Sequence, residues 1–336
     1  MCEPLVAFPI QNMSLINGGV MGHWIVDRLG TVDPKNGWGE WPFVNSVPGP
    51  LLKISNASVV QCPLAGGQGV GLFLYPKADL FPETLGCVLF LHDLGHDATS
   101  GYWLFYEDFL RLGCAVLAIN WDGHGKPCAS DLDFQLSTRS ISLILQRLSG
   151  VPQFPFFLSG HGVGSTIVLS SASREDVFQL IRGILVSAPI LFPVTPFQLT
   201  METLSNLYPW TLYKKFVSLL NRIGCFGAFK ALNAYRIFGN QLSVRVGLKR
   251  HIQLSDYVTN IFFEGELLRK IKNPILWVSP GKSLLVSNKL ALTAFSQISH
   301  GLFFVHDCNI NHCSAAWSHG FRSAVFVLSE WMKQAK

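Results

Sequence analysis

Short runs of hydrophobic residues recur along the chain from about residue 58, and most are separated by helical patterns. From the third run onward they are almost continuously apolar, which is typical of parallel strands covered on both faces. We predict eight strands, at residues 58–65, 69–76, 86–92, 114–120, 154–160, 183–189, 274–279 and 301–306. Apolar residues at three- and four-residue spacing predict helices at residues 102–112, 133–149, 163–173, 288–298 and 315–334. This alternation favours a doubly wound α/β fold.

The alternation stops between residues 193 and 272, where amphipathic helical segments occur without a clear strand. We predict that this segment is a helical cap over the carboxyl edge of the sheet, where open α/β folds bind their ligands. Residues 58–192 and 273–336 then form the core. Residues 1–57 show no clear period, and we expect an N-terminal extension.

The composition favours a folded chain with a large core, because 49% of its 336 residues are hydrophobic and 14% are charged. No apolar segment reaches the ~20 residues of a membrane helix. The first residues lack the basic segment of a signal peptide. We therefore expect a cytoplasmic protein, with peripheral membrane contact as an open alternative.

The net charge of +5 is concentrated in the predicted cap. Residues 193–262 contain eight Lys and Arg residues and two acidic residues, so they carry +6 and the remainder carries −1. Within residues 207–238 the basic side chains lie mostly off an apolar stripe. Such a helix can lie in a membrane interface or pack its apolar face on the core, and we favour packing. We expect no nucleic-acid partner.

The eight cysteines are scattered without a C-x-x-C pair, which indicates reduced thiols rather than a disulfide framework. His306, Cys308, His312 and Cys313 lie close together, but their spacing matches no standard zinc site. A pocket of histidines from separate loops is conceivable, although separate loops do not guarantee convergence. We therefore expect neither a metal nor a cofactor.

A glycine-rich turn, Gly160-His161-Gly162-Val163-Gly164, follows the fifth predicted strand and precedes a small-residue helix. A strand, a tight turn and a helix in this order form the elbow that presents a nucleophilic serine in the pattern G-x-S-x-G. Here Gly162 occupies the position of the serine.

Three other segments also follow predicted strands: FLHDLGHDA (90–98), AINWDGHGKP (118–127) and INHCSAAWSHG near the C-terminus. With LSGHGVGS (158–165), they resemble the α/β-hydrolase superfamily, in particular its monoacylglycerol lipase, lysophospholipase and serine aminopeptidase-like branch. The corresponding stretches of that branch read H-G-x-G, D-x-x-G-H-G, G-H and G-H-S-x-G-G. The resemblance covers residues 58–336 and implies an α/β-hydrolase fold, with a mostly parallel eight-stranded sheet, helices on both faces and a cap insertion.

The resemblance also implies the positions of a catalytic triad, and two of its three members are missing. His312 lies at the position of the base, but Gly162 and Ser283 stand where the nucleophile and the acid would be. Asp307 is a possible substitute acid. Loss of the acid alone typically costs about 10⁴ in turnover.

A displaced nucleophile is the alternative to a lost one. Ser159 and Ser165 flank the turn, but one ends the predicted strand and the other lies a turn into the helix. Neither is expected to project from the tip of the elbow. We therefore favour loss of the nucleophile.

The resemblance places the two oxyanion-binding N–H groups at Leu94 and Val163. Asp93 replaces the first glycine of the family's oxyanion loop, and its carboxylate is unfavourable there if it points inward. The direction of Asp93 stays open at this point. His92, His96 and His161 are expected to line the pocket.

These observations favour a noncatalytic α/β-hydrolase-fold protein that binds a lipid-like small molecule or a protein partner. The alternative is an active serine-type esterase or lipase, acting on acylglycerols or lysophospholipids through a displaced nucleophile.

Overall fold

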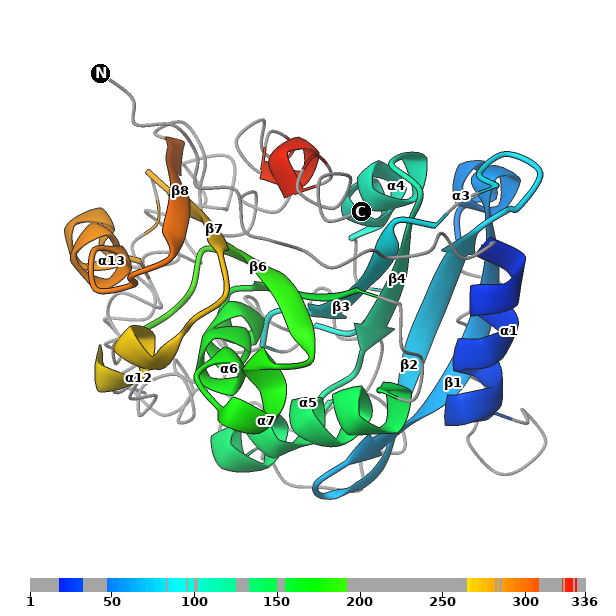
Figure 1. Cartoon of the computed structure of the whole chain (residues 1–336), viewed down its shortest axis with the longest axis horizontal. Coiled ribbons are helices and arrows are strands. Elements are labelled where there is room, and N and C mark those ends of the chain that lie inside the picture. The colour runs from blue at the N-terminus through cyan, green and yellow to red at the C-terminus, as the bar shows by residue number, and fades with distance from the viewer. Residues whose placement is uncertain are drawn as a thin grey trace, which may run out of the picture.

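An eight-stranded sheet lies at the centre of the molecule (Figure 1), with the strand order β1-β2-β4-β3-β5-β6-β7-β8. The structure, a computed structural model, describes residues 18–32, 47–82, 84–94, 96–99, 102–124, 133–149, 155–191, 265–281, 283, 286–307, 322, 324–328 and 330. The strands are β1 (Ser55–Leu64), β2 (Gly67–Pro76), β3 (Gly86–Leu91), β4 (Cys114–Ile119), β5 (Phe156–His161), β6 (Ile181–Ser187), β7 (Ile275–Pro280) and β8 (Gly301–Asp307). β2 pairs antiparallel with β1 and β4, and the other neighbours are parallel. The predicted fold class is confirmed.

Helices cover both faces of the sheet (Figure 1). One face packs against α1 (Gly18–Leu29), α5 (Phe134–Leu148), α6 (Val163–Ala172), α7 (Glu175–Phe178), α12 (Gly265–Lys270) and α13 (Asn288–Phe295). The other face packs against α3 (Gly49–Ile54), α4 (Trp103–Arg111) and the helical residues 324–328.

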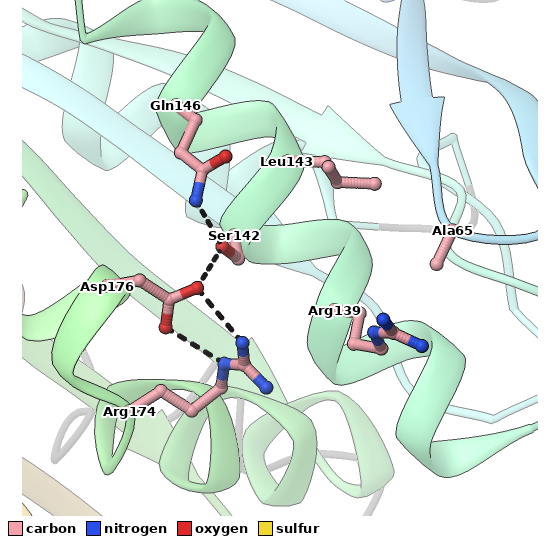
Figure 2. A pocket seen from close by; sticks show the side chains of 7 residues that line it. All are labelled: Ala65, Arg139, Ser142, Leu143, Gln146, Arg174 and Asp176. Atoms are coloured by element: carbon pink, nitrogen blue, oxygen red, sulfur yellow. Dashed lines mark hydrogen bonds and ion pairs between the residues drawn. The ribbon is translucent and has the colours of Figure 1, made fainter.

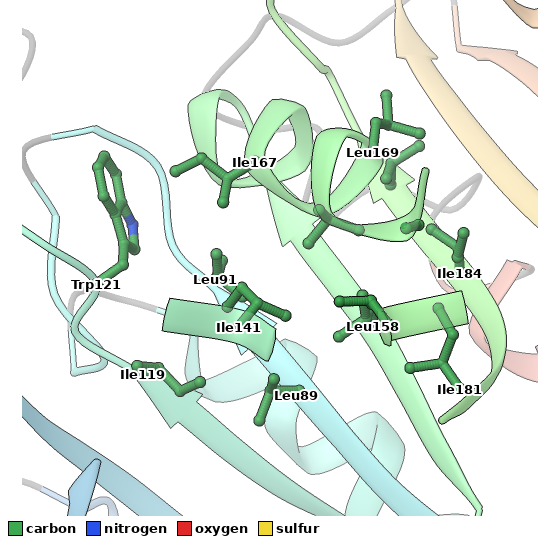
Figure 3. Packing of buried hydrophobic residues seen from close by; sticks show 14 of the residues in the cluster. Leu89, Leu91, Ile119, Trp121, Ile141, Leu158, Ile167, Leu169, Ile181 and Ile184 are labelled. Carbon is green, nitrogen blue, oxygen red and sulfur yellow. The ribbon is translucent and has the colours of Figure 1, made fainter. Parts of the chain in front are cut away.

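The central strand β3 shows why the sequence pattern is continuous rather than alternating. Leu89 and Leu91 belong to the core on the α5 and α6 face, which Figure 3 shows. Phe90 belongs to the core on the opposite face, where its ring centroid lies 4.5 Å from that of Phe105 in α4. Successive strand residues point to opposite faces, and both faces are buried here, so every position is apolar.

The parallel register brings three loops to one edge of the sheet. Leu91 of β3 pairs with Ile119 of β4 on one side and with Gly160 of β5 on the other. The loops that follow these strands therefore leave the sheet side by side. They contain the H-D-L-G segment, the W-D-G-H segment and the glycine elbow.

The loop after β4 also secures the turn between β1 and β2. The Asp122 carboxylate accepts hydrogen bonds from Ser140 Oγ of α5 at 2.5 Å and from the Gly66 N–H at 3.2 Å. Ser140 Oγ in turn accepts the N–H of Ala65 at 2.7 Å. These bonds connect the loop after β4, helix α5 and the β1–β2 turn.

Within the described ranges, no helix is long and apolar enough to cross a membrane. The cap predicted at residues 193–272 lies outside the described residues up to residue 264, and so does the basic segment 207–238. The same holds for His312 and for much of residues 1–57.

Candidate functional site

The glycine turn forms a tight elbow between β5 and α6. Gly162 has φ 55° and ψ −122°, in the left-handed region that favours glycine, and its N–H donates to the Ser187 carbonyl at 2.9 Å. A Cβ atom at Gly160 or Gly164 would come within 3.0 Å of neighbouring backbone atoms. The backbone of a nucleophile elbow is therefore present, with no side chain at its tip.

The Asp93 carboxylate points into this elbow. Asp93 Oδ1 accepts the N–H of Val163 at 2.8 Å and the N–H of Leu94 at 2.8 Å. Only 5% of Asp93 is exposed. The two N–H groups that the family resemblance places at the oxyanion site thus converge on one atom, at the 2.7–3.1 Å that such donors require. That atom belongs to the protein itself.

Asp93 also takes the space next to Gly162. A Cβ atom built on Gly162 would lie within 3.0 Å of Asp93 Oδ1, Cγ and Oδ2. Real Cβ atoms do not make contacts this short, so a side chain at position 162 would require the carboxylate to move. The acid from the loop after β3 thus lies where a nucleophile on the elbow would begin.

Backbone and side-chain contacts hold the Asp93 loop in place. The Asp93 N–H donates to Tyr102 Oη at 3.1 Å, and the Asp93 carbonyl accepts the His96 N–H at 3.1 Å. The Tyr102 hydroxyl also lies 3.3 Å from His96 Nδ1. Tyr102 is fully buried at the start of α4, and nothing in the sequence marks it as part of the site, because a single tyrosine next to a loop carries no motif.

His92 is buried and neutral beside this loop. Its Nδ1 lies 2.7 Å from the Asp93 carbonyl, so Nδ1 carries the proton and donates. Its Nε2 is buried, and no residue that the structure describes is its hydrogen-bond partner. Burial lowers the pKa of His92 to about 4, because a second proton would bring an unpaired charge into the interior.

The other histidines of this edge pack against aromatic rings. His124 lies with its ring centroid 3.8 Å from that of Trp121, and Trp121 Nε1 donates to the His92 carbonyl at 3.1 Å. His161 Nδ1 lies 3.4 Å from Ser187 Oγ. Among the residues that the structure describes, no group of three His, Cys, Asp or Glu side chains could hold a metal ion.

Neither serine near the elbow is exposed. Ser165 Oγ lies 2.6 Å from the Gly160 carbonyl and 2.9 Å from the Ser187 carbonyl, and it accepts the Ser187 N–H at 3.0 Å. Ser159 is fully buried, and within the described part of the chain its Oγ has no hydrogen-bond partner. Ser165 therefore stabilises the packing of α6 on β5 and β6, and its hydroxyl group is engaged within the core.

The other triad positions that the resemblance implies follow β7 and β8 in the sequence. Ser283 Oγ accepts the N–H of Val286 at 3.2 Å, and no carboxylate occurs in the sequence between Glu266 and Asp307. Asp307 is the last residue of β8, and only its backbone is described. His312 lies outside the described residues, so the structure does not place the base relative to the elbow.

Comparison with known proteins supports the fold independently. Residues 88–297, more than half of the chain, match the alpha/beta hydrolase family. Curated proteins gave no sequence match. An esterase from Pyrococcus furiosus is similar with a TM-score of 0.58 at 14% identity, over 90% of this chain and 98% of the esterase.

Two further solved structures show the same likeness. DcsB, solved with its substrate analogue, gives a TM-score of 0.58 at 16% identity over 83% of this chain and 99% of DcsB. The alpha/beta hydrolase GrgF from Penicillium sp. sh18 gives 0.55 at 13% identity over 84% of this chain and 98% of GrgF. At such identities the likeness concerns the fold alone.

Proposed function

This chain belongs to the alpha/beta hydrolase family, and we propose that it is a noncatalytic member, which binds a lipid-like small molecule or a protein partner. The observation that carries this proposal is the position of the Asp93 carboxylate, which accepts both oxyanion-site N–H groups and lies against Gly162. Three requirements of serine-hydrolase chemistry are opposed at this site, one by Gly162 and two by the Asp93 carboxylate.

The first requirement is a nucleophile, and Gly162 supplies none. The second is a pair of N–H donors that wait for a developing oxyanion. Here those donors already have an anionic acceptor, so a substrate carbonyl would have to displace a carboxylate. The third is an electrostatic environment that favours a new negative charge, and a carboxylate within contact distance repels one.

The lipid-like ligand rests on the motifs shared with the monoacylglycerol lipase and lysophospholipase branch. We place the ligand at the carboxyl edge of the sheet, under the predicted cap at residues 193–272. A cytoplasmic location belongs to the same proposal.

The test is fluorophosphonate labelling of the purified full-length protein, with any adduct mapped by mass spectrometry and p-nitrophenyl acetate and butyrate turnover measured in parallel. A characterised serine esterase provides the positive control. We expect no adduct and no turnover above background. A single labelled serine together with turnover would establish an active esterase with a displaced nucleophile.

The ligand is sought in the same preparation. Organic extraction followed by mass spectrometry identifies any lipid that copurifies, and 1-oleoylglycerol is the first compound for a thermal-shift titration. If the protein forms no fluorophosphonate adduct, retains no lipid and does not respond to 1-oleoylglycerol, the lipid-like ligand is excluded in favour of a protein partner.

A further inference from the structure

A groove of about 330 Å³ lies between α5, the start of α7 and the β1–β2 turn (Figure 2). It lies at the far end of α6 from the elbow, since Gly162 precedes this helix and Arg174 follows its last residue, Ala172, by two positions. Ten helical residues span about 15 Å. The groove is therefore separate from the carboxyl-edge site.

One side of the groove carries an arginine in a fixed position. Arg174 Nε and Nη2 donate to the two carboxylate oxygens of Asp176, at 3.0 and 2.9 Å. Asp176 Oδ2 also accepts Ser142 Oγ at 2.5 Å, and Ser142 Oγ accepts Gln146 Nε2 at 3.0 Å. The Arg174 hydrogen bond is the main reason that the pKa of Asp176 is lowered. Figure 2 shows this chain of hydrogen bonds along the groove.

The second arginine has no anionic partner within the described part of the chain. Arg139 lines the groove from α5 and is exposed. No acidic residue occurs in α5, so no helical neighbour at three or four residues can pair with it. Asp176 balances one of the two guanidinium groups, and the groove retains one positive charge.

The size and lining of the groove restrict what fits. A volume of 330 Å³ is at the lower end of the range for ligand pockets. About ten water molecules take up this volume in liquid water. The groove accommodates one or two side chains. Leu143, 40% exposed, and Ala65 add apolar surface next to the arginines.

We infer that this groove binds a carboxylate side chain from an acidic segment of a protein partner. A planar guanidinium group matches a carboxylate with two parallel hydrogen bonds, and Arg139 is available for them. Leu143 contacts the apolar residue next to the acid. The assignment does not depend on what the elbow does, because the two sites share no residue.

The test is an NMR titration of the full-length protein, observing the arginine Nε–Hε resonances. The probe is the peptide acetyl-Leu-Asp-Glu-Leu-amide, and its neutral analogue acetyl-Leu-Asn-Gln-Leu-amide is the matched control. We expect saturable shifts at Arg139 and Arg174 with the acidic peptide only. Arg139→Glu should weaken its binding at least about tenfold, as expected for loss of a charge-assisted pair.

Two charge-matched variants separate a built site from general attraction to positive charge. Lys289→Glu makes the same change in net charge on the exposed face of α13, and Arg147→Glu makes it on α5 outside the groove. Both should retain binding within about twofold. Equal binding of the neutral peptide, or equal weakening by all three variants, would overturn the inference. Inorganic phosphate binding without peptide binding would also overturn it, in favour of a free-anion site.

Discussion

Asp93 and Gly162 fill one space between them: the carboxylate of the first lies where a side chain on the second would start. The hydrogen bonds from Val163 and Leu94 keep the acid there, at 2.8 Å each. A buried carboxylate with two N–H donors is well satisfied, so this arrangement is stable as it stands. The Asp93 carboxylate therefore fills the space at the tip of the elbow and is a structural part of it.

Replacing Gly162 with serine should destabilise the protein and produce no esterase activity. The new Cβ atom meets Asp93, and overpacking of this kind typically costs about 1–3 kcal/mol. Urea unfolding and p-nitrophenyl acetate hydrolysis measure the two effects. A Gly162→Ser variant as stable as the parent would show that Asp93 moves aside easily, and strong turnover would show that His312 has a competent partner.

Asp93→Gly should cost less stability in the Gly162→Ser background than in the parent, because there it also removes the carboxylate that meets the new side chain. The double variant should be less destabilised than the sum of the single variants, by more than about 0.5 kcal/mol. Additive losses would indicate that the two residues do not compete for one space.

Asp93→Ala should reduce the free energy of unfolding by about 2–4 kcal/mol, since the buried N–H groups of Leu94 and Val163 lose their acceptor. Asp93→Asn keeps an oxygen acceptor of the same size, and its loss should be smaller. Denaturant unfolding of both variants checks the order. Equal losses would mean that the negative charge, rather than the acceptor, is what the site requires.

The free energy of unfolding should fall as the pH is lowered from about 6.5 toward 4. Unfolded His92 takes up a proton near its ordinary pKa of 6.5, whereas in the folded protein its pKa is about 4. The contribution of the neutral ring is complete above pH 6.5, and on the order of 3 kcal/mol is lost by pH 4.

The measurement for His92 is urea unfolding at several pH values between 4.5 and 7.5, with His92→Asn for comparison. Asparagine can donate to the Asp93 carbonyl but does not titrate, so the slope against pH should be smaller in this variant. An unchanged slope would assign the pH dependence to groups other than His92.

Ser165→Ala should cost about 1–3 kcal/mol, because the Ser187 N–H and two carbonyl groups lose their partner in the core. The variant should label with fluorophosphonate no differently from the parent. Unchanged stability together with loss of a labelled peptide would make Ser165 a displaced nucleophile instead.

The sequence sufficed for the sheet because β3, β4, β5 and β7 are buried at every position, so runs such as 88–91 are continuously apolar. It did not predict α1, which contains Gly18, Gly19 and Gly22. Gly22 is required by packing, since a Cβ atom there would come within 3.0 Å of the Tyr75 ring. Helix propensity alone disfavours such a segment, and tertiary contact determines it.

At the candidate site the motif order located Gly162, Val163 and Leu94, but it left the direction of Asp93 open. That direction depends on N–H groups from two different loops, which only the folded register brings together. The Arg174–Asp176 pair was missed for a similar reason. Ser142, which also donates a hydrogen bond to Asp176, lies 34 residues before it in the sequence.

The contact between Asp93 and Gly162 also couples the two positions against single substitutions. A serine introduced at position 162 would meet the carboxylate, and removal of Asp93 alone would leave the buried N–H groups of Leu94 and Val163 without that acceptor. Either change by itself is therefore expected to lower the stability of the fold, and only a paired change at positions 93 and 162 avoids the clash.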